Sequence, residues 1–219
     1  MVVGVIFDID GTLVTFRFDV QGTRLALFDE LRRHGLGTQG LDLRSATQTI
    51  LDSAREQSDA GLGPGYETIR ESVFAILDGF EVQSAASASI IPGALDVVDG
   101  LRSRGVRLGV LTNSGRKAAE ATLRRAGLMD RFEFVLTRDE TRIMKPRPEG
   151  MEMAAAKLGL PKGSIFYVGD SAQDVHAAIS AGIKVVSVAT GNYTAERLSA
   201  EGADFVVSGL SELGAILGI

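Results

Sequence analysis

The chain has 219 residues, a formal net charge of −5 and 45% hydrophobic residues, which is ordinary for one globular domain with a small insertion. The negative charge argues against a surface that binds nucleic acid or an anionic membrane. The absence of cysteine excludes disulfides, thiolate metal sites and cysteine nucleophiles, and two histidines argue against a multi-histidine zinc site. Because the sequence contains neither a membrane-length apolar run nor a secretory signal, we expect a cytoplasmic protein. We expect it to be a monomer or a homodimer.

The first predicted element is an apolar strand over residues 2–7, of the kind that is buried on both faces in a parallel sheet. Asp8, Asp10, Gly11 and Thr12 follow it directly. In an extended chain, Asp8 and Asp10 point to the same side, and like charges so close need a shared proton or a cation. A solvated strand end followed by a turn is the plainer alternative.

Residues 13–89 show helical spacing and no convincing strand. The expected helices cover residues 19–34, 43–60 and 66–80, with glycine-rich breakers between them. Residues 83–89 are small and polar and are predicted to be a linker. We therefore expect a helical cap domain, residues 15–89, inserted just after the two acids and lying over the ligand-binding end of the sheet.

From residue 90 onward, strand and helix patterns alternate. Further strands are expected at 106–111, 132–136, 165–168, 185–188 and 205–207, with helices at 94–104, 114–126, 147–158, 171–181 and 210–217. This alternation predicts an α/β fold whose core, residues 1–14 and 90–219, is a Rossmann-like, doubly wound parallel sheet. The helical cap is then an insertion after the first strand of that core.

Polar side chains come after four of the predicted strands. In chain order they are Asp8 and Asp10, then Thr112 and Asn113, then Lys145, and finally Asp170 and Asp174. Because the carboxyl ends of parallel strands face one crevice, we expect these groups to converge. Taken singly, Thr112 and Asp170 could be helix caps and Lys145 a surface lysine. The ordered set of four is hard to produce by capping alone.

Together these residues fit phosphoryl transfer. Asp8 could attack phosphorus, and Mg²⁺ held by Asp8 and Asp170 would screen the charge repulsion. Asp10 could donate a proton to the leaving alkoxide and later take one from water. Thr112, Asn113 and Lys145 could bind the phosphate oxygens.

Four segments, residues 8–12, 112–113, 145–146 and 169–174, resemble the four motifs of the haloacid dehalogenase (HAD) superfamily. Residues 169–182 and the early helical insertion are particularly similar to the phosphoglycolate phosphatase and β-phosphoglucomutase group. The resemblance implies that the strand carrying Asp8 lies in the middle of the sheet. Its neighbours would be the strands that lead to Thr112 and Asp170.

The resemblance also implies a role for each residue. Asp8 would be the nucleophile and a Mg²⁺ ligand, and Asp10 the general acid and base, binding the metal through its backbone carbonyl. Asp170 would be the third protein ligand, while Thr112 and Lys145 would hold the phosphoryl group. Asp174 would support either the metal or Lys145, and the remaining supporting positions would be Gly11, Thr12, Gly169 and Ser171.

An acid at Asp10 favours ester chemistry, because an alkoxide benefits from protonation as it leaves whereas a halide does not. We therefore expect a Mg²⁺-dependent phosphatase that acts on a small, phosphoglycolate-like metabolite through an aspartyl-phosphate. A phosphomutase of the same fold and a non-catalytic protein that binds a phosphorylated metabolite are the alternatives. Five arginines of the helical insertion could meet a second anionic group, and the sequence assigns none of them: Arg17, Arg24, Arg44, Arg55 and Arg70.

Overall fold

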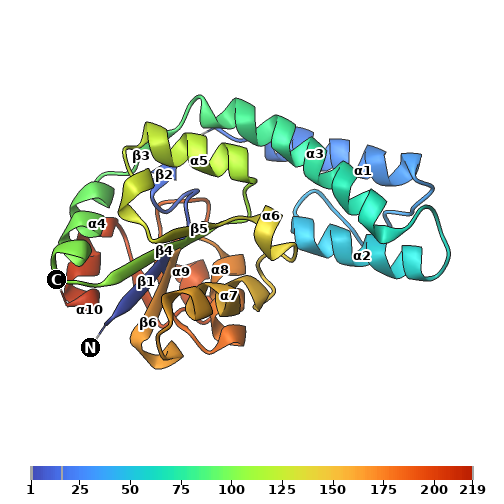
Figure 1. Ribbon diagram of the computed structural model, residues 1–219. Coiled ribbons are helices and arrows are strands. Elements are labelled where there is room, and N and C mark those ends of the chain that lie inside the picture. Colours follow the sequence, from blue (N-terminus) through green and yellow to red (C-terminus); the bar gives the residue numbers. More distant parts are fainter. Residues whose placement is uncertain (1, 16, 219) are drawn as a thin grey trace.

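The computed structural model describes residues 2–15 and 17–218, and Figure 1 shows a helix-flanked sheet with a group of helices beside it. Residues 1, 16 and 219, which belong to the predicted domain ranges, lie outside the described residues. Within the described residues, no helix combines the length and apolar character needed to cross a membrane.

The described residues form a six-stranded parallel sheet in the order β5-β4-β1-β6-β7-β8. Its strands are β1 (Gly4–Phe7), β4 (Arg107–Leu111), β5 (Phe134–Leu136), β6 (Ile165–Gly169), β7 (Lys184–Val188) and β8 (Phe205–Val207). This is a doubly wound order whose reversal falls at β1, the point where such sheets bind ligands. The predicted fold class and the central place of the first strand are confirmed.

Helices cover both faces of this sheet (Figure 1). One face packs against α4 (Ala94–Ser103), α5 (Arg116–Arg125) and α10 (Leu213–Leu217), and the other against α7 (Glu149–Leu158), α8 (Ala172–Ala181) and α9 (Ala195–Ala200). Successive residues of a strand point to opposite faces, so Val5 and Phe7 enter one apolar layer and Ile6 enters the other. Burial on both sides fixes β1 and therefore the position of Asp8, which follows it.

The helices α1 (Val20–Arg33), α2 (Thr47–Asp59) and α3 (Tyr66–Ala85) pack around an apolar cluster of their own. Ile50, Leu51 and Ile69 are fully buried in it. Met144, from the loop that precedes Lys145, also belongs to this cluster. The helical group is therefore packed directly onto a loop of the predicted site.

Two predictions for the insertion are wrong. Helix α3 continues to Ala85, so the first three residues of the predicted linker are helical, since that stretch contains no glycine or proline to end the helix. A short strand β2 (Val14–Thr15) pairs antiparallel with β3 (Ser89–Ile90) where the insertion leaves and rejoins the sheet domain. Strands of two residues are too short to show an alternating pattern. The short helices α6 (Arg138–Thr141) and α9 were also not predicted.

Candidate active site

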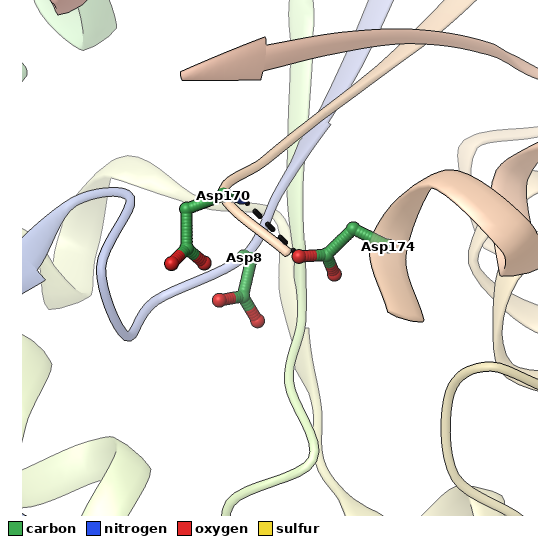
Figure 2. A group of neighbouring side chains, drawn as sticks. All are labelled: Asp8, Asp170 and Asp174. Atoms are coloured by element: carbon green, nitrogen blue, oxygen red, sulfur yellow. Dashed lines mark hydrogen bonds between the residues drawn. The ribbon is translucent and has the colours of Figure 1, made fainter. Parts of the chain in front are cut away.

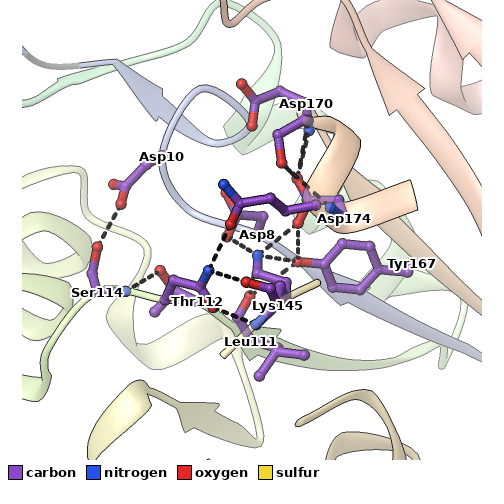
Figure 3. Close-up of polar contacts among 12 residues, drawn as sticks. Asp8, Asp10, Leu111, Thr112, Ser114, Lys145, Tyr167, Asp170 and Asp174 are labelled. Atoms are coloured by element: carbon purple, nitrogen blue, oxygen red, sulfur yellow. Dashed lines mark hydrogen bonds and ion pairs between the residues drawn. The ribbon is translucent and has the colours of Figure 1, made fainter. Parts of the chain in front are cut away.

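The polar residues expected to converge do lie together at the carboxyl edge of the sheet (Figure 3). Asp8 follows β1, Thr112 follows β4 and Asp170 follows β6, while Lys145 lies on the loop between α6 and α7. These four side chains are buried. Because the parallel strands end at the same edge of the sheet, they bring together residues that are more than 150 positions apart in the chain.

Lys145 is the cation at the centre of the site. Its Nζ donates to Asp8 Oδ1 at 2.7 Å, to Asp174 Oδ1 at 2.6 Å and to the Tyr167 hydroxyl at 2.7 Å. Burial by itself would lower the pKa of the ammonium, but Asp174 and Asp8 more than offset it, so the pKa of Lys145 lies above its ordinary value. Lys145 therefore stays charged and is held in one position beside Asp8.

Asp174 is itself held by the start of α8. Its Oδ2 accepts from Ser171 Oγ at 2.7 Å and from the Ser171 N–H at 3.0 Å, in a capping box. Gly169 lies so close that a Cβ there would clash with the Asp174 carboxyl group. Burial alone would raise the pKa of Asp174, yet Lys145 brings it below its ordinary value. Both carboxylate oxygens of Asp174 therefore accept hydrogen bonds. Oδ2 accepts from Ser171, and Oδ1 accepts from Lys145.

Asp10 turns to a different partner, since Ser114 Oγ donates to its Oδ2 at 2.6 Å (Figure 3). Burial, and then the charge of Asp8, raises the pKa of Asp10 to about 8. Burial also raises the pKa of Asp8, but Lys145 opposes it and the pKa reaches only about 6. Two neighbouring acids with separated pKa values can take opposite protonation states near neutral pH.

The loop after β4 carries two of the three predicted phosphate-binding residues, Thr112 and Asn113. Thr112 Oγ1 accepts from the Ser114 N–H at 3.1 Å, which leaves its hydroxyl proton able to donate. Asn113 Oδ1 accepts from the Lys145 N–H at 2.9 Å, and Asn113 Nδ2 donates to the Lys145 carbonyl at 3.0 Å. The Asn113 side chain is thereby occupied in fixing the main chain of Lys145.

Three carboxyl groups converge where a cation could bind. Ligand atoms of Asp8, Asp170 and Asp174 lie within 4.8 Å of one another (Figure 2). Burial, and then the charges of Asp174 and Asp8, raises the pKa of Asp170 well above its ordinary value. A Cβ at Gly11, where φ is +80°, or at Gly191 would overlap Asp170 Oδ2, so both glycines leave room for that oxygen. Lys145 supplies one positive charge to this group of three carboxyl groups, and hard oxygen ligands with an excess of negative charge fit Mg²⁺.

The model of the haloacid dehalogenase-like hydrolase family matches residues 2–182. The chain belongs to this family. It is 34% identical to the phosphoglycolate phosphatase of Rhodospirillum rubrum over 223 residues, which cover 98% of this chain and 90% of that protein. It is 27% identical to the N-acetylmuramic acid 6-phosphate phosphatase of Pseudomonas aeruginosa, over 95% of this chain and 92% of that protein.

A solved structure shares the fold of this HAD-like hydrolase. CbbY from Rhodobacter sphaeroides, in complex with phosphate, matches with a TM-score of 0.66 and 22% identity, covering the whole of both chains. Together, the family and the relatives named as phosphatases identify the chain as a phosphatase.

Sequence reasoning did not assign four residues that shape the site of this HAD-like phosphatase. Ser114 directly follows the segment 112–113, but the sequence does not show that its hydroxyl contacts Asp10. Tyr167 lies inside β6, and its hydroxyl contacts cannot be read from an apolar strand pattern. Glu81 of α3 and Arg138 of α6 form a buried ion pair, with Arg138 Nη1 at 2.7 Å from both Glu81 oxygens. Nothing local in the sequence links positions so far apart.

The remaining supporting residue, Thr12, is fully buried behind Gly11, and its Oγ1 has no hydrogen-bond partner among residues 2–15 and 17–218. Beside the carboxylates opens a cavity of about 620 Å³. Asp10, Ser114 and Asp170 line it from the sheet domain, and Arg24 and Thr47 line it from the helical group. The space next to the carboxylates is therefore lined by residues from both parts of the molecule.

Proposed function

We propose that the chain hydrolyses the phosphate monoester of a small metabolite, with Mg²⁺, through an aspartyl-phosphate on Asp8. The observation that carries this proposal is that the two neighbouring acids have different partners, Lys145 for Asp8 and Ser114 for Asp10. Asp8 has the lower pKa and faces the cationic Lys145, whereas Asp10 has the higher pKa and accepts from Ser114. A nucleophile must be ionised and a general acid must be protonated, and these environments supply both at once.

In the first step, a carboxylate oxygen of Asp8 attacks phosphorus while the bond from phosphorus to the ester oxygen breaks. Asp10 gives its proton to that leaving oxygen. Lys145 and the Thr112 hydroxyl, together with the Asn113 main-chain N–H, would bind the phosphoryl oxygens as charge builds on them. The product alcohol leaves, and the phosphoryl group remains on Asp8.

In the second step, Asp10 is a carboxylate and takes a proton from a water molecule that attacks phosphorus. The bond from phosphorus to Asp8 breaks, Asp8 becomes a carboxylate again and inorganic phosphate is released. Bound by Asp8, Asp170 and the Asp10 carbonyl, Mg²⁺ would neutralise the negative charge that otherwise keeps phosphate away from the carboxylates. Asp174 would act through Lys145, which it holds in place.

We also propose that residues 15–89 act as a cap over this site. Its separate apolar cluster and the two-residue strands at its junction support a unit that is distinct from the sheet domain. A phosphoglycolate-like metabolite is the leading candidate substrate, since the relative at 34% identity is named a phosphoglycolate phosphatase and is matched over nearly its whole length.

The test is hydrolysis of p-nitrophenyl phosphate by the purified protein. We expect activity with Mg²⁺, no activity after EDTA, and none in Asp8→Asn. Asp130→Asn is the matched control, because Asp130 is exposed and lies in the short 3-10 helix Met129–Arg131 that precedes β5, away from the carboxyl edge of the sheet. A folded Asp8→Asn protein that keeps its activity would overturn the mechanism.

A further inference from the structure

Arg24 of α1 is a cation that lines the cavity beside the catalytic carboxylates. Its Nη1 donates to Thr47 Oγ1 at 2.9 Å. Its Nε is buried and has no hydrogen-bond partner within the described residues. Burial lowers the pKa of the guanidinium, and no carboxylate of the described chain acts to raise it again. Arg24 thus faces the cavity without a counter-ion from the protein.

The other arginines of the helical group are placed differently. Arg70 pairs with Glu67 at 2.6 Å, and the guanidinium of Arg55 lies over the Tyr66 ring, 4.2 Å from its centroid. Arg17 and Arg44 are exposed, although Arg17 also reaches the cavity. A charge taken out of water without a partner is costly to the fold. Of the five candidates, Arg24 is the one whose surroundings call for an anion from outside the chain.

We infer that Arg24 and Thr47 form a subsite for a second oxyanion of the substrate, so that the preferred substrates are phosphate monoesters that also carry a carboxylate or a second phosphoryl group. This inference rests on the proposed function. The guanidinium fork suits two-point binding of carboxylate or phosphate. Thr47 accepts from Arg24 and can donate its own hydroxyl proton to the same anion.

The charges along the cavity give such a substrate one orientation. Asp8, Asp10 and Asp170 gather at the sheet end, and a second anion not held by the phosphate-binding groups is repelled from there. On the helical side, Arg24 and Arg17 are the cations that line the cavity, and the Glu81 carboxylate there is paired with Arg138. The reacting phosphate therefore enters toward Asp8 and the second anion stays with α1, which makes Arg24 a determinant of specificity rather than of the chemical step.

Three substrates on one two-carbon skeleton test this. Phosphoglycolate carries a carboxylate, ethylene glycol bisphosphate carries a second phosphoryl group, and hydroxyethyl phosphate carries neither. We expect the wild-type protein to favour at least one of the anionic esters over hydroxyethyl phosphate. In Arg24→Gln, kcat/KM for that ester should fall by roughly tenfold or more, mainly through KM, because one charge-assisted contact is lost. Hydroxyethyl phosphate and p-nitrophenyl phosphate should change by less than about twofold.

Two further variants separate charge from geometry. Arg24→Lys keeps the charge but loses the fork, so its preference should fall between the wild type and Arg24→Gln. Thr47→Val keeps Arg24 and removes the hydroxyl group that accepts from it. The preference for the anionic ester should therefore weaken, with less disturbance of the fold. The matched control is Arg33→Gln, which removes the same charge from the exposed face of α1 and should leave every ratio unchanged.

Measurements of binding without turnover test this inference separately from the proposed function. Titration calorimetry in an Asp8→Asn background compares the affinities of the three esters with and without Arg24→Gln. The inference stands if Arg24→Gln weakens the binding of one or both anionic esters and leaves the binding of hydroxyethyl phosphate unchanged. It fails if Arg24→Gln weakens all three esters equally or none of them. A wild-type protein that binds the esters but hydrolyses none would overturn the proposed function alone.

Discussion

Asp8 and Asp10 are two positions apart in the chain, yet each meets a different partner. Lys145 favours the ionised form of Asp8, while burial and the charge of Asp8 favour the neutral form of Asp10. Each pKa unit corresponds to about 1.4 kcal/mol, so the separation between about 6 and about 8 is a substantial bias. The residue types alone could suggest the two roles, but the side chains that enforce them come from distant loops.

Ser114→Ala tests whether the contact to Asp10 matters for proton transfer. Without its hydrogen bond, Asp10 loses the orientation that aims its proton at the leaving oxygen. We expect the kcat for an alkyl phosphate to fall roughly tenfold and that for p-nitrophenyl phosphate to fall less, because nitrophenolate leaves without help. Ser103→Ala, on the exposed end of α4, is the control. Equal losses on both substrates would argue against this role for Ser114.

Asp10→Asn should stabilise the metal-free protein, and increasingly so at higher pH. A carboxyl whose pKa rises on folding takes up a proton as the chain folds, so the wild-type protein loses stability as pH increases from about 4 towards about 8. Asparagine does not ionise and escapes this loss. The advantage of Asp10→Asn in the free energy of unfolding should therefore grow by up to about 1.4 kcal/mol per pH unit between the two pKa values.

Urea denaturation in EDTA, at about pH 5 and about pH 8, measures this difference. Asp130→Asn provides the background for an exposed acid. A stability difference between Asp10→Asn and wild type that is the same at both pH values would contradict the raised pKa.

At the scale of elements, α3, the loop after β4 and α6 meet at the buried pair of Glu81 and Arg138. Glu81 Oε2 also accepts from the Gly115 N–H at 2.9 Å, and Arg138 Nη1 donates to the Asn113 carbonyl at 3.1 Å. Asp78 of α3 is a further partner of Arg138. The pair thus ties α3 to the loop that carries Thr112 and Asn113, the proposed phosphate-binding residues.

Removing one member of this pair should cost more than removing both. Arg138→Met leaves the Glu81 carboxylate buried without its cation, which costs roughly 3–5 kcal/mol of stability. In Arg138→Met/Glu81→Gln the remaining group is neutral, so part of that loss should return. Urea denaturation of both single variants and the double variant gives the coupling energy. Arg32→Met, which breaks an exposed pair with Asp29, should change stability by less than about 1 kcal/mol.

Additive losses in that double-mutant cycle would show that Glu81 and Arg138 act independently. The sequence could not suggest this pair, because Glu81 and Arg138 lie outside the predicted helices and look like ordinary surface charges. The sheet strands, by contrast, could be predicted, since a continuous apolar run such as residues 2–7 reports burial on both faces directly. The two-residue strands β2 and β3 give no such signal.

At the scale of the whole molecule, the helical group holds the site from two sides. Gln48 of α2 accepts from the Met144 N–H at 2.8 Å, next to Lys145, while Glu81 of α3 holds the loop after β4. The motifs predicted where the site is, because parallel strands deliver their ends to one edge. They could not predict these long-range contacts or the cavity between the two parts, which depend on how separately folded segments pack.

Mg²⁺ should stabilise the folded protein as a whole. A ligand that binds only the folded state adds about 2.7 kcal/mol when present at 100 times its dissociation constant. We therefore expect the melting temperature to rise with Mg²⁺ in the wild type and in Asp130→Asn, and to rise much less in Asp170→Asn, which lacks one carboxylate of the cluster. An undiminished rise in Asp170→Asn would place the cation elsewhere.

The central claim is that Asp8 carries the phosphoryl group during turnover. Acid quenching of the enzyme during hydrolysis, followed by borohydride, reduces an acyl phosphate to an alcohol, and peptide mass spectrometry then locates the altered residue. We predict homoserine in place of aspartate at position 8, only when Mg²⁺ and substrate are both present, and none in Asp8→Asn. Steady turnover with position 8 unmodified, or with the modification at Asp10 or Asp170, would contradict the account.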